Sequence, residues 1–151
     1  MLKDQQFAFI GVDPIIVHEG KIVLAQRGEG SEVDIDKWHI PGALVKAGET
    51  LREALKRAVK EKTNLDIDLL IDGESFASFV KFYDTPTREP RYHDVAMSFL
   101  CKVVGGEMKP GPRMTDVKAF AIEEIETLEI GFDHKQIVLD GINKLKELQL
   151  I

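Results

Sequence analysis

Apolar and polar residues follow one another in blocks that predict strands, then a helix, then further strands and a final helix. The first two apolar blocks, residues 7–17 and 21–26, are rich in β-branched side chains and are separated by His18, Glu19 and Gly20. Two such runs around a glycine-containing turn are typical of a β-hairpin. Residues 27–37 hold glycines and four acidic residues, so they are predicted to form a loop.

Residues 50–63 carry signals for both ends of a helix. Thr50 and Glu53 have the spacing of a capping box, and apolar side chains recur at helical spacing at positions 51, 54, 55, 58 and 59. Asn64 is suited to the left-handed conformation that ends many helices, a role that glycine fills more often. Just before this helix, residues 43–45 are predicted to form a short strand.

The remaining blocks complete the predicted fold. Strands are expected at residues 65–71, 74–82, 95–104 and 117–122, a short helix at 122–128 and a longer amphipathic helix at 133–148. Residues 83–93 hold two prolines and three basic residues, and fit a loop beside a substrate as well as a solvated connection. We expect an α/β (α+β) fold, with a mixed sheet covered by helices, in a single domain over residues 1–151.

Composition excludes several classes of function. Apolar residues make up 44% of the chain, but no run approaches the roughly 18 apolar residues of a membrane helix. The first ten residues lack a secretory signal, so we expect a cytoplasmic protein without membrane contact. The net charge of −6 comes without a basic stripe, which argues against polymer nucleic acid. A small anionic substrate stays compatible, because local cations can reverse the field in one cleft. The single cysteine, Cys101, is expected to be buried and inert rather than reactive.

One segment, residues 41–65, resembles the signature motif of the Nudix family. That motif runs glycine, five residues, glutamate, seven residues, then Arg-Glu-apolar-any-Glu-Glu-any-Gly-apolar. The matches at the required separations are Glu49, Arg57, Val59, Glu61 and Leu65. The sequences Trp38-His39-Ile40-Pro41-Gly42, Gly48-Glu49-Thr50 and Phe132-Asp133-His134 also look like the family's usual surroundings.

The resemblance implies a fold, a reaction and a set of site residues. It implies a Nudix-type α/β/α sandwich with a mixed central sheet, and Mg²⁺- or Mn²⁺-assisted hydrolysis of a nucleoside diphosphate linked to another moiety. Glu61, Glu49 and the Gly42 carbonyl would hold the metal ion, and Arg57 would orient the glutamates. Residues 88–93 resemble a region of small ADP-ribose-cleaving members, which makes ADP-ribose the leading substrate. The candidate substrate-binding residues are Lys62, Trp38, Arg91 and His93, and the resemblance is also compatible with a homodimer.

Four positions depart from the motif. Ala43 and Asn64 replace glycines and are mild changes, whereas Ala58 and Lys62 replace glutamates. Positions 58, 61 and 62 lie within about 100° of one helix face, where three carboxylates would otherwise meet one ion. At ~4 Å and an effective dielectric of ~20, an ammonium and a divalent ion repel by about 8 kcal/mol. Lys62 must therefore swing away from the ion or take its place.

Two functions stay open at this point. One is a Nudix hydrolase with a weakened metal site, in which any ion is bound weakly and with help from the substrate. The other is a catalytically inactive nucleotide-binding or sensor module, in which Lys62 contacts phosphate directly; a scaffold with an idle cleft is a third reading.

Structural roles compete with several of these assignments. Lys62 fits the carbonyl end of its helix equally well, Trp38 fits a core anchor, and Glu53, Arg57 and Glu61 fit a salt-bridge ladder. The further carboxylate that many family members supply from elsewhere cannot be chosen among the acids outside the motif, which are Glu107, Asp116, Glu123 and Glu124.

Overall fold

The structure is a computed structural model that describes residues 4–73 and 75–151. The predicted hairpin is present: β1 (Phe9–His18) and β2 (Lys21–Arg27) pair antiparallel. Glu19 and Gly20 between them have φ values of 52° and 75°. Positive φ at both central residues is the requirement of the tight turn that matches the twist of a hairpin.

The other elements follow in the predicted order. The short strands β3 (Trp38–His39) and β4 (Ala43–Leu44) precede α1 (Leu51–Thr63) and β5 (Leu65–Leu69). A 3₁₀ helix η1 (Ser75–Ser78), β6 (Phe79–Tyr83), β7 (Asp94–Gly106) and β8 (Met114–Phe120) come next, followed by α2 (Ile122–Ile125) and α3 (His134–Glu147). The sheet runs β3-β2-β1-β7-β5, with β4 on β1, β6 on β7 and β8 on β2. It is mixed, because β1 pairs with β7 in parallel and with β2 antiparallel.

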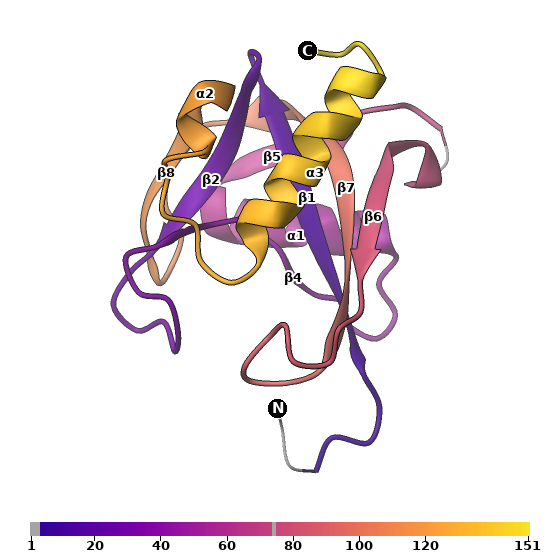
Figure 1. The fold of residues 1–151 in the computed structure, drawn as a ribbon, viewed down its shortest axis with the longest axis vertical. Coiled ribbons are helices and arrows are strands. Elements are labelled where there is room, and N and C mark those ends of the chain that lie inside the picture. The colour runs from indigo at the N-terminus through magenta and orange to yellow at the C-terminus, as the bar shows by residue number, and fades with distance from the viewer. Residues whose placement is uncertain (1–3, 74) are drawn as a thin grey trace.

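Both faces of the sheet are apolar and each is covered by a long helix. Val12 and Ile16 of β1 pack on the side of α1, whereas Ile15 between them packs on the side of α3. In Figure 1, α3 crosses in front of β1 and β7 while α1 lies behind the sheet. Because successive strand residues point to opposite faces, a strand buried on both sides appears as an unbroken apolar run. The predicted mixed sheet with helices on its faces is confirmed.

The ends of α1 are also as predicted. Thr50 Oγ1 accepts a hydrogen bond from the Glu53 amide at 3.1 Å, and Glu53 Oε1 accepts one from the Thr50 amide at 3.3 Å. Asn64 ends the helix with φ 63°. Local sequence therefore fixes the length of the helix that carries Arg57, Glu61 and Lys62.

Two local predictions need correction. Residues 75–78 form a 3₁₀ helix rather than the start of a strand, and the predicted strand residue Glu74 lies outside the described residues. The Ser78 hydroxyl accepts from the Ile71 amide at 2.9 Å and donates to the Ile71 carbonyl at 3.4 Å, which holds the chain in a turn. Strand β3 was not predicted, because two residues are too few to show a pattern.

Two further expectations concern the class of protein. Cys101 is fully buried, as predicted, and burial raises the pKa of its thiol. Within the described residues, no helix has the length and apolar character needed to cross a membrane.

Candidate functional site

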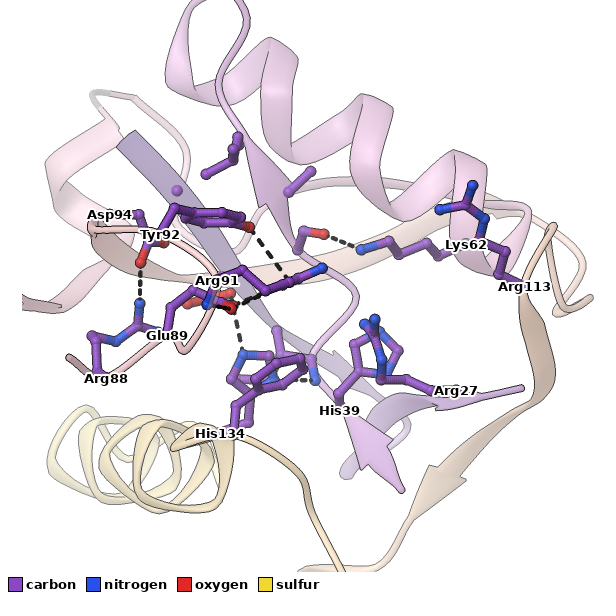
Figure 2. Close-up of a pocket in the computed structure, with 17 residues that line it drawn as sticks. Arg27, His39, Lys62, Arg88, Glu89, Arg91, Tyr92, Asp94, Arg113 and His134 are labelled. Carbon is purple, nitrogen blue, oxygen red and sulfur yellow. Dashed lines mark hydrogen bonds and ion pairs between the residues drawn. The ribbon is translucent and has the colours of Figure 1, made fainter. Parts of the chain in front are cut away.

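A pocket of about 250 Å³ opens at one end of the central strands β1, β2 and β7, beside the last turn of α1 and the start of α3. The lining side chains come from strands at the centre of the sheet, from the last turn of α1, from the loop at 84–93 and from the start of α3 (Figure 2). The arginines and lysine in the described lining are Arg27, Lys62, Arg88, Arg91 and Arg113, and the acids are Asp13, Glu89 and Asp94. Although the chain has a net charge of −6, positively charged side chains are concentrated around this pocket.

Lys62 reaches from α1 into this pocket. Its Nζ donates a hydrogen bond to the carbonyl oxygen of Gly42, drawn as a dashed line in Figure 2. Burial, with help from the nearby Arg27 charge, lowers the pKa of Lys62 from 10.5 to about 8. The ammonium is therefore mostly protonated at neutral pH, although partial burial disfavours its charge.

The backbone at Gly42 lies close to strand β1. A Cβ at this position would lie 2.6 Å from Asp13 Oδ1 and would also clash with the Val12 carbonyl oxygen. The absence of a side chain is what lets the backbone pass here and turn its carbonyl toward Lys62.

Glu49 and Arg57 form a brace between the loop before α1 and the helix itself. Arg57 Nε donates to Glu49 Oε2 at 2.7 Å, and Arg57 Nη2 donates to Glu49 Oε1 and the Leu44 carbonyl, each at 2.9 Å. These bonds to Arg57 lower the pKa of Glu49 to about 2. Arg57 Nη1 is also 3.8 Å from Glu61 Oε1. Of the salt-bridge ladder considered above, the pair of Arg57 with Glu61 is present, while the hydrogen bonds of Arg57 go to Glu49.

Motif positions 58 and 61 differ in how far they are exposed to solvent. The Glu61 side chain is 57% exposed, whereas Ala58 is fully buried. Among residues 4–73 and 75–151, no group of three or more His, Cys, Asp or Glu side chains is arranged to hold a metal ion.

Asp13 is a carboxylate that interrupts the apolar run of β1. Its side chain lines the pocket, 3.9 Å from His134 Nε2, and the residue is only 7% exposed. Burial raises the pKa of Asp13 from 3.8 to about 7, although the Arg88 charge opposes the rise.

Asp13 should make stability depend on pH. The folded state holds the Asp13 proton between pH 4 and about 7 while the unfolded state has lost it, so this residue's contribution to the free energy of unfolding falls as pH rises. We expect Asp13→Asn to gain on the order of 2 kcal/mol relative to the natural protein across this window. Thermal melts of both proteins at several pH values measure the difference. The exposed Asp72→Asn is the control, and a pH-independent difference for Asp13→Asn would contradict the assignment.

Two buried histidines line the pocket with opposite tautomers. His39 Nδ1 donates to the Ala25 carbonyl at 2.8 Å, whereas His134 Nδ1 accepts from the Ile40 amide at 2.9 Å. Burial lowers the pKa of His39 well below 6.5 and that of His134 to about 3. Both rings are neutral, so the positive charge of the pocket comes from arginine and lysine.

The loop at 84–93 lies at the pocket, which favours the first of its two interpretations. Arg88 anchors it through Asp94 at 2.5 Å and through two bonds to Asp133 at 2.8 and 3.0 Å. Arg91 bonds to Glu89 at 2.9 and 3.1 Å. Its guanidinium lies 5.8 Å from the Phe132 ring centroid, and that of Arg27 lies 5.1 Å from the same ring. Arg27, Arg91 and the Phe132 ring thus lie together on one side of the pocket.

The candidate residues divide into two groups. Gly42, Lys62 and Arg91 line the pocket. The described lining does not include Glu49, Arg57, Glu61, Trp38 or His93. Trp38 packs against Phe120 with ring centroids 4.7 Å apart, as the core-anchor reading expects. His93 bonds through its backbone to Gln5.

Several lining residues had no predicted role, including Asp13, Arg27, His39, Arg113, Phe132 and His134. A signal existed for Asp13, since a charge in a doubly buried strand calls for an explanation. The four acids considered outside the motif, which are Glu107, Asp116, Glu123 and Glu124, do not appear in the described lining.

Known proteins resemble this chain in sequence and in fold. The NUDIX domain family matches residues 10–140. An ADP-ribose pyrophosphatase of Methanocaldococcus jannaschii is 32% identical over 131 residues, which cover 87% of this chain and 71% of that protein. A MutT/nudix family protein from Enterococcus faecalis has a TM-score of 0.75 at 19% identity, and the match covers 97% of this chain and 65% of the other. The NUDIX domain of Shewanella oneidensis NrtR, crystallised with ADP ribose, has a TM-score of 0.74 at 18% identity, over 95% of this chain and 92% of that chain.

Proposed function

This chain belongs to the NUDIX domain family, and from that premise we propose that it binds a nucleoside diphosphate linked to a second moiety, with ADP-ribose as the leading compound, and hydrolyses it slowly. The observation that carries the proposal is the Lys62 ammonium on the Gly42 carbonyl, within a ring of arginines. A relative 32% identical in sequence is named an ADP-ribose pyrophosphatase, which supports this choice of compound.

The diphosphate would lie against the basic side of the pocket. Lys62 supplies a compact, poorly hydrated charge, and Arg91 supplies a planar donor that is already held in place by Glu89. Arg27 and Arg113 line the same hollow, so a doubly charged group would be surrounded from several directions. Arg27 is buried and Lys62 and Arg91 are partly buried, so water screens these three charges less than it screens the exposed Arg113, which strengthens their attraction for phosphate.

We infer that the residues present do not fit a divalent ion well. The Gly42 carbonyl accepts from Lys62, position 58 offers a methyl group, and Glu61 faces solvent beside Arg57. When bound, a divalent ion supplies the hydrolytic nucleophile by lowering the pKa of a water molecule. Lys62 can neutralise phosphate charge but cannot supply that chemistry, so binding is retained where turnover is weakened.

Restoring the missing acids tests this proposal. We expect an Ala58→Glu, Lys62→Glu variant to hydrolyse ADP-ribose with Mg²⁺ at least tenfold faster than the natural protein, because two carboxylates return to the metal-facing side of α1. Product release measured by chromatography gives the rate. The charge reversal Lys56→Glu on the exposed side of the same helix is the control. If the natural protein turns over as fast as the restored variant, the weakened site is refuted.

Folding and binding need separate measurements in that experiment. Ala58 is fully buried, so a glutamate there carries a desolvation cost unless an ion neutralises it. The single variant Lys62→Glu avoids this cost and is measured in parallel, together with the melting temperature of each protein. ADP-ribose should stabilise the natural protein with or without Mg²⁺. Stabilisation without any turnover would favour the sensor function, and no stabilisation would refute both.

A further inference from the structure

One polar atom in the pocket is left without a partner. His39 is 1% exposed, and its Nε2 has no hydrogen-bond partner within the described residues. Because Nδ1 carries the hydrogen that it donates to the Ala25 carbonyl, Nε2 of the neutral ring bears a free lone pair. The pairing of His39 with Ala25 across β3 and β2 fixes the ring in this orientation.

The surroundings make this acceptor unusual. A buried polar group without a partner is costly, and native proteins keep few of them. His93 Nε2 is also unpaired, but His93 is not among the described pocket-lining residues. Of the three acids in the described lining, Glu89 and Asp94 are already bonded to Arg91 and Arg88, and the Asp13 carboxyl lies 3.9 Å from His134 Nε2. His39 Nε2 is therefore a buried acceptor in the pocket lining that lacks a partner among the described residues.

The chemistry of the proposed ligand limits what can donate to Nε2. An ionised diphosphate offers only acceptor oxygens, so it satisfies Lys62 and the arginines but not His39. The hydroxyl groups of the sugar beside the diphosphate are donors. Lys62 and His39 line the same pocket, so a sugar joined to a phosphate at Lys62 would lie on the side of the pocket that His39 lines.

We propose that His39 is a specificity-determining residue, whose Nε2 accepts a hydrogen bond from a sugar hydroxyl of the ligand when the diphosphate lies at Lys62. This inference rests on the proposed function, because it assumes a sugar nucleotide in this pocket. The ring would then distinguish sugar-linked diphosphates from diphosphate alone. In Figure 2, His39 lies between His134 and Arg27 along one side of the pocket.

Calorimetric titration of His39 variants with ADP-ribose and with inorganic pyrophosphate tests the inference. We expect His39→Phe to lower the ADP-ribose affinity about tenfold, because the ring shape is kept and the acceptor is lost. Pyrophosphate affinity should change less than about twofold, since pyrophosphate has no sugar hydroxyl. His39→Gln, whose amide oxygen can replace Nε2, should recover most of the ADP-ribose affinity. His18→Phe is the control, because it makes the same exchange at a histidine outside the described pocket lining and should alter neither affinity.

The outcomes separate this inference from the proposed function. If the natural protein binds neither compound, the proposed function and the inference both fail. If it binds both, and His39→Phe weakens them equally or leaves both unchanged, only the inference fails. Nitrogen-15 spectra of the natural protein give a readout that needs no variant to fold: Nε2 should be unprotonated, and its resonance should move with ADP-ribose and not with pyrophosphate. A protonated Nε2 would overturn the inference.

Discussion

Replacing Lys62 with glutamine is expected to weaken ADP-ribose binding in the absence of divalent metal by about 50-fold. The expected loss corresponds to a charge-assisted hydrogen bond to phosphate, worth roughly 1.5–3 kcal/mol. The Lys62 Nζ already points to the Gly42 carbonyl inside the pocket, so little side-chain freedom would be lost when a phosphate binds. Isothermal titration calorimetry with the metal removed by chelator measures the affinity.

The same substitution should raise stability while it lowers affinity. The pKa of Lys62 falls from 10.5 to about 8 on folding because of burial, so at neutral pH the folded state carries an unfavourable charge. This cost is present below pH 8 and is relieved as pH rises from about 8 to 10.5. Lys62→Gln should therefore melt at a higher temperature at pH 7, and its advantage should shrink toward pH 10. Opposite effects on binding and stability are typical of functional sites.

A nearby lysine provides the control for both measurements. Lys60 lies two residues away on the same helix, pairs with Asp66 at 3.1 Å and is exposed. Lys60→Gln should alter ADP-ribose affinity less than twofold and stability by less than about 0.5 kcal/mol. If Lys62→Gln binds ADP-ribose within twofold of the natural protein, Lys62 is a structural residue and the proposed mode of phosphate binding is wrong.

Replacing Arg88 with methionine should destabilise the fold by about 3–5 kcal/mol. The Arg88 side chain is 9% exposed and is bonded to Asp94 and to Asp133, so its loss leaves acidic groups in a poorly hydrated place without their cation. Roughly 10 °C of melting temperature would be lost in a chain of this size. Calorimetric melts and urea titration give the free energy of unfolding. The loop at 84–93 should also become sensitive to proteases, because Arg88 joins it to Asp133, the residue just before α3.

A surface ion pair with similar geometry tests whether burial, rather than pairing alone, accounts for the loss of stability. Arg52 also forms two hydrogen bonds to one aspartate, Asp68, at 2.8 and 2.7 Å, but its side chain is 45% exposed. Arg52→Met should cost less than about 1 kcal/mol. Adding Asp94→Asn to Arg88→Met should recover part of the lost stability, since it removes one of the stranded charges. Equal losses for Arg52→Met and Arg88→Met would contradict this explanation.

Helix α1, which carries the motif, shows which structural features are determined by residues close together in the sequence. Thr50, Glu53 and Asn64 fixed both ends of α1, because capping depends on side chains within a few residues of the backbone groups that they satisfy. Apolar runs predicted the strands and the mixed sheet for a similar reason, since their periodicity reflects burial on its two faces. The 3₁₀ turn at 75–78 was missed because it depends on one hydrogen-bonded contact between Ser78 and Ile71.

For the site, the sequence determined that the chain carries a Nudix-like motif in which a lysine and an alanine replace two acids. It could not determine where the Lys62 ammonium goes, which required the position of the Gly42 carbonyl 20 residues earlier. Nor could it select Asp13, His39 and Arg88, whose roles depend on elements far apart in the chain that meet at one end of the central strands. Helix ends and strand faces follow from short-range patterns, whereas charge, burial and unpaired atoms in a pocket depend on which distant groups tertiary packing brings together.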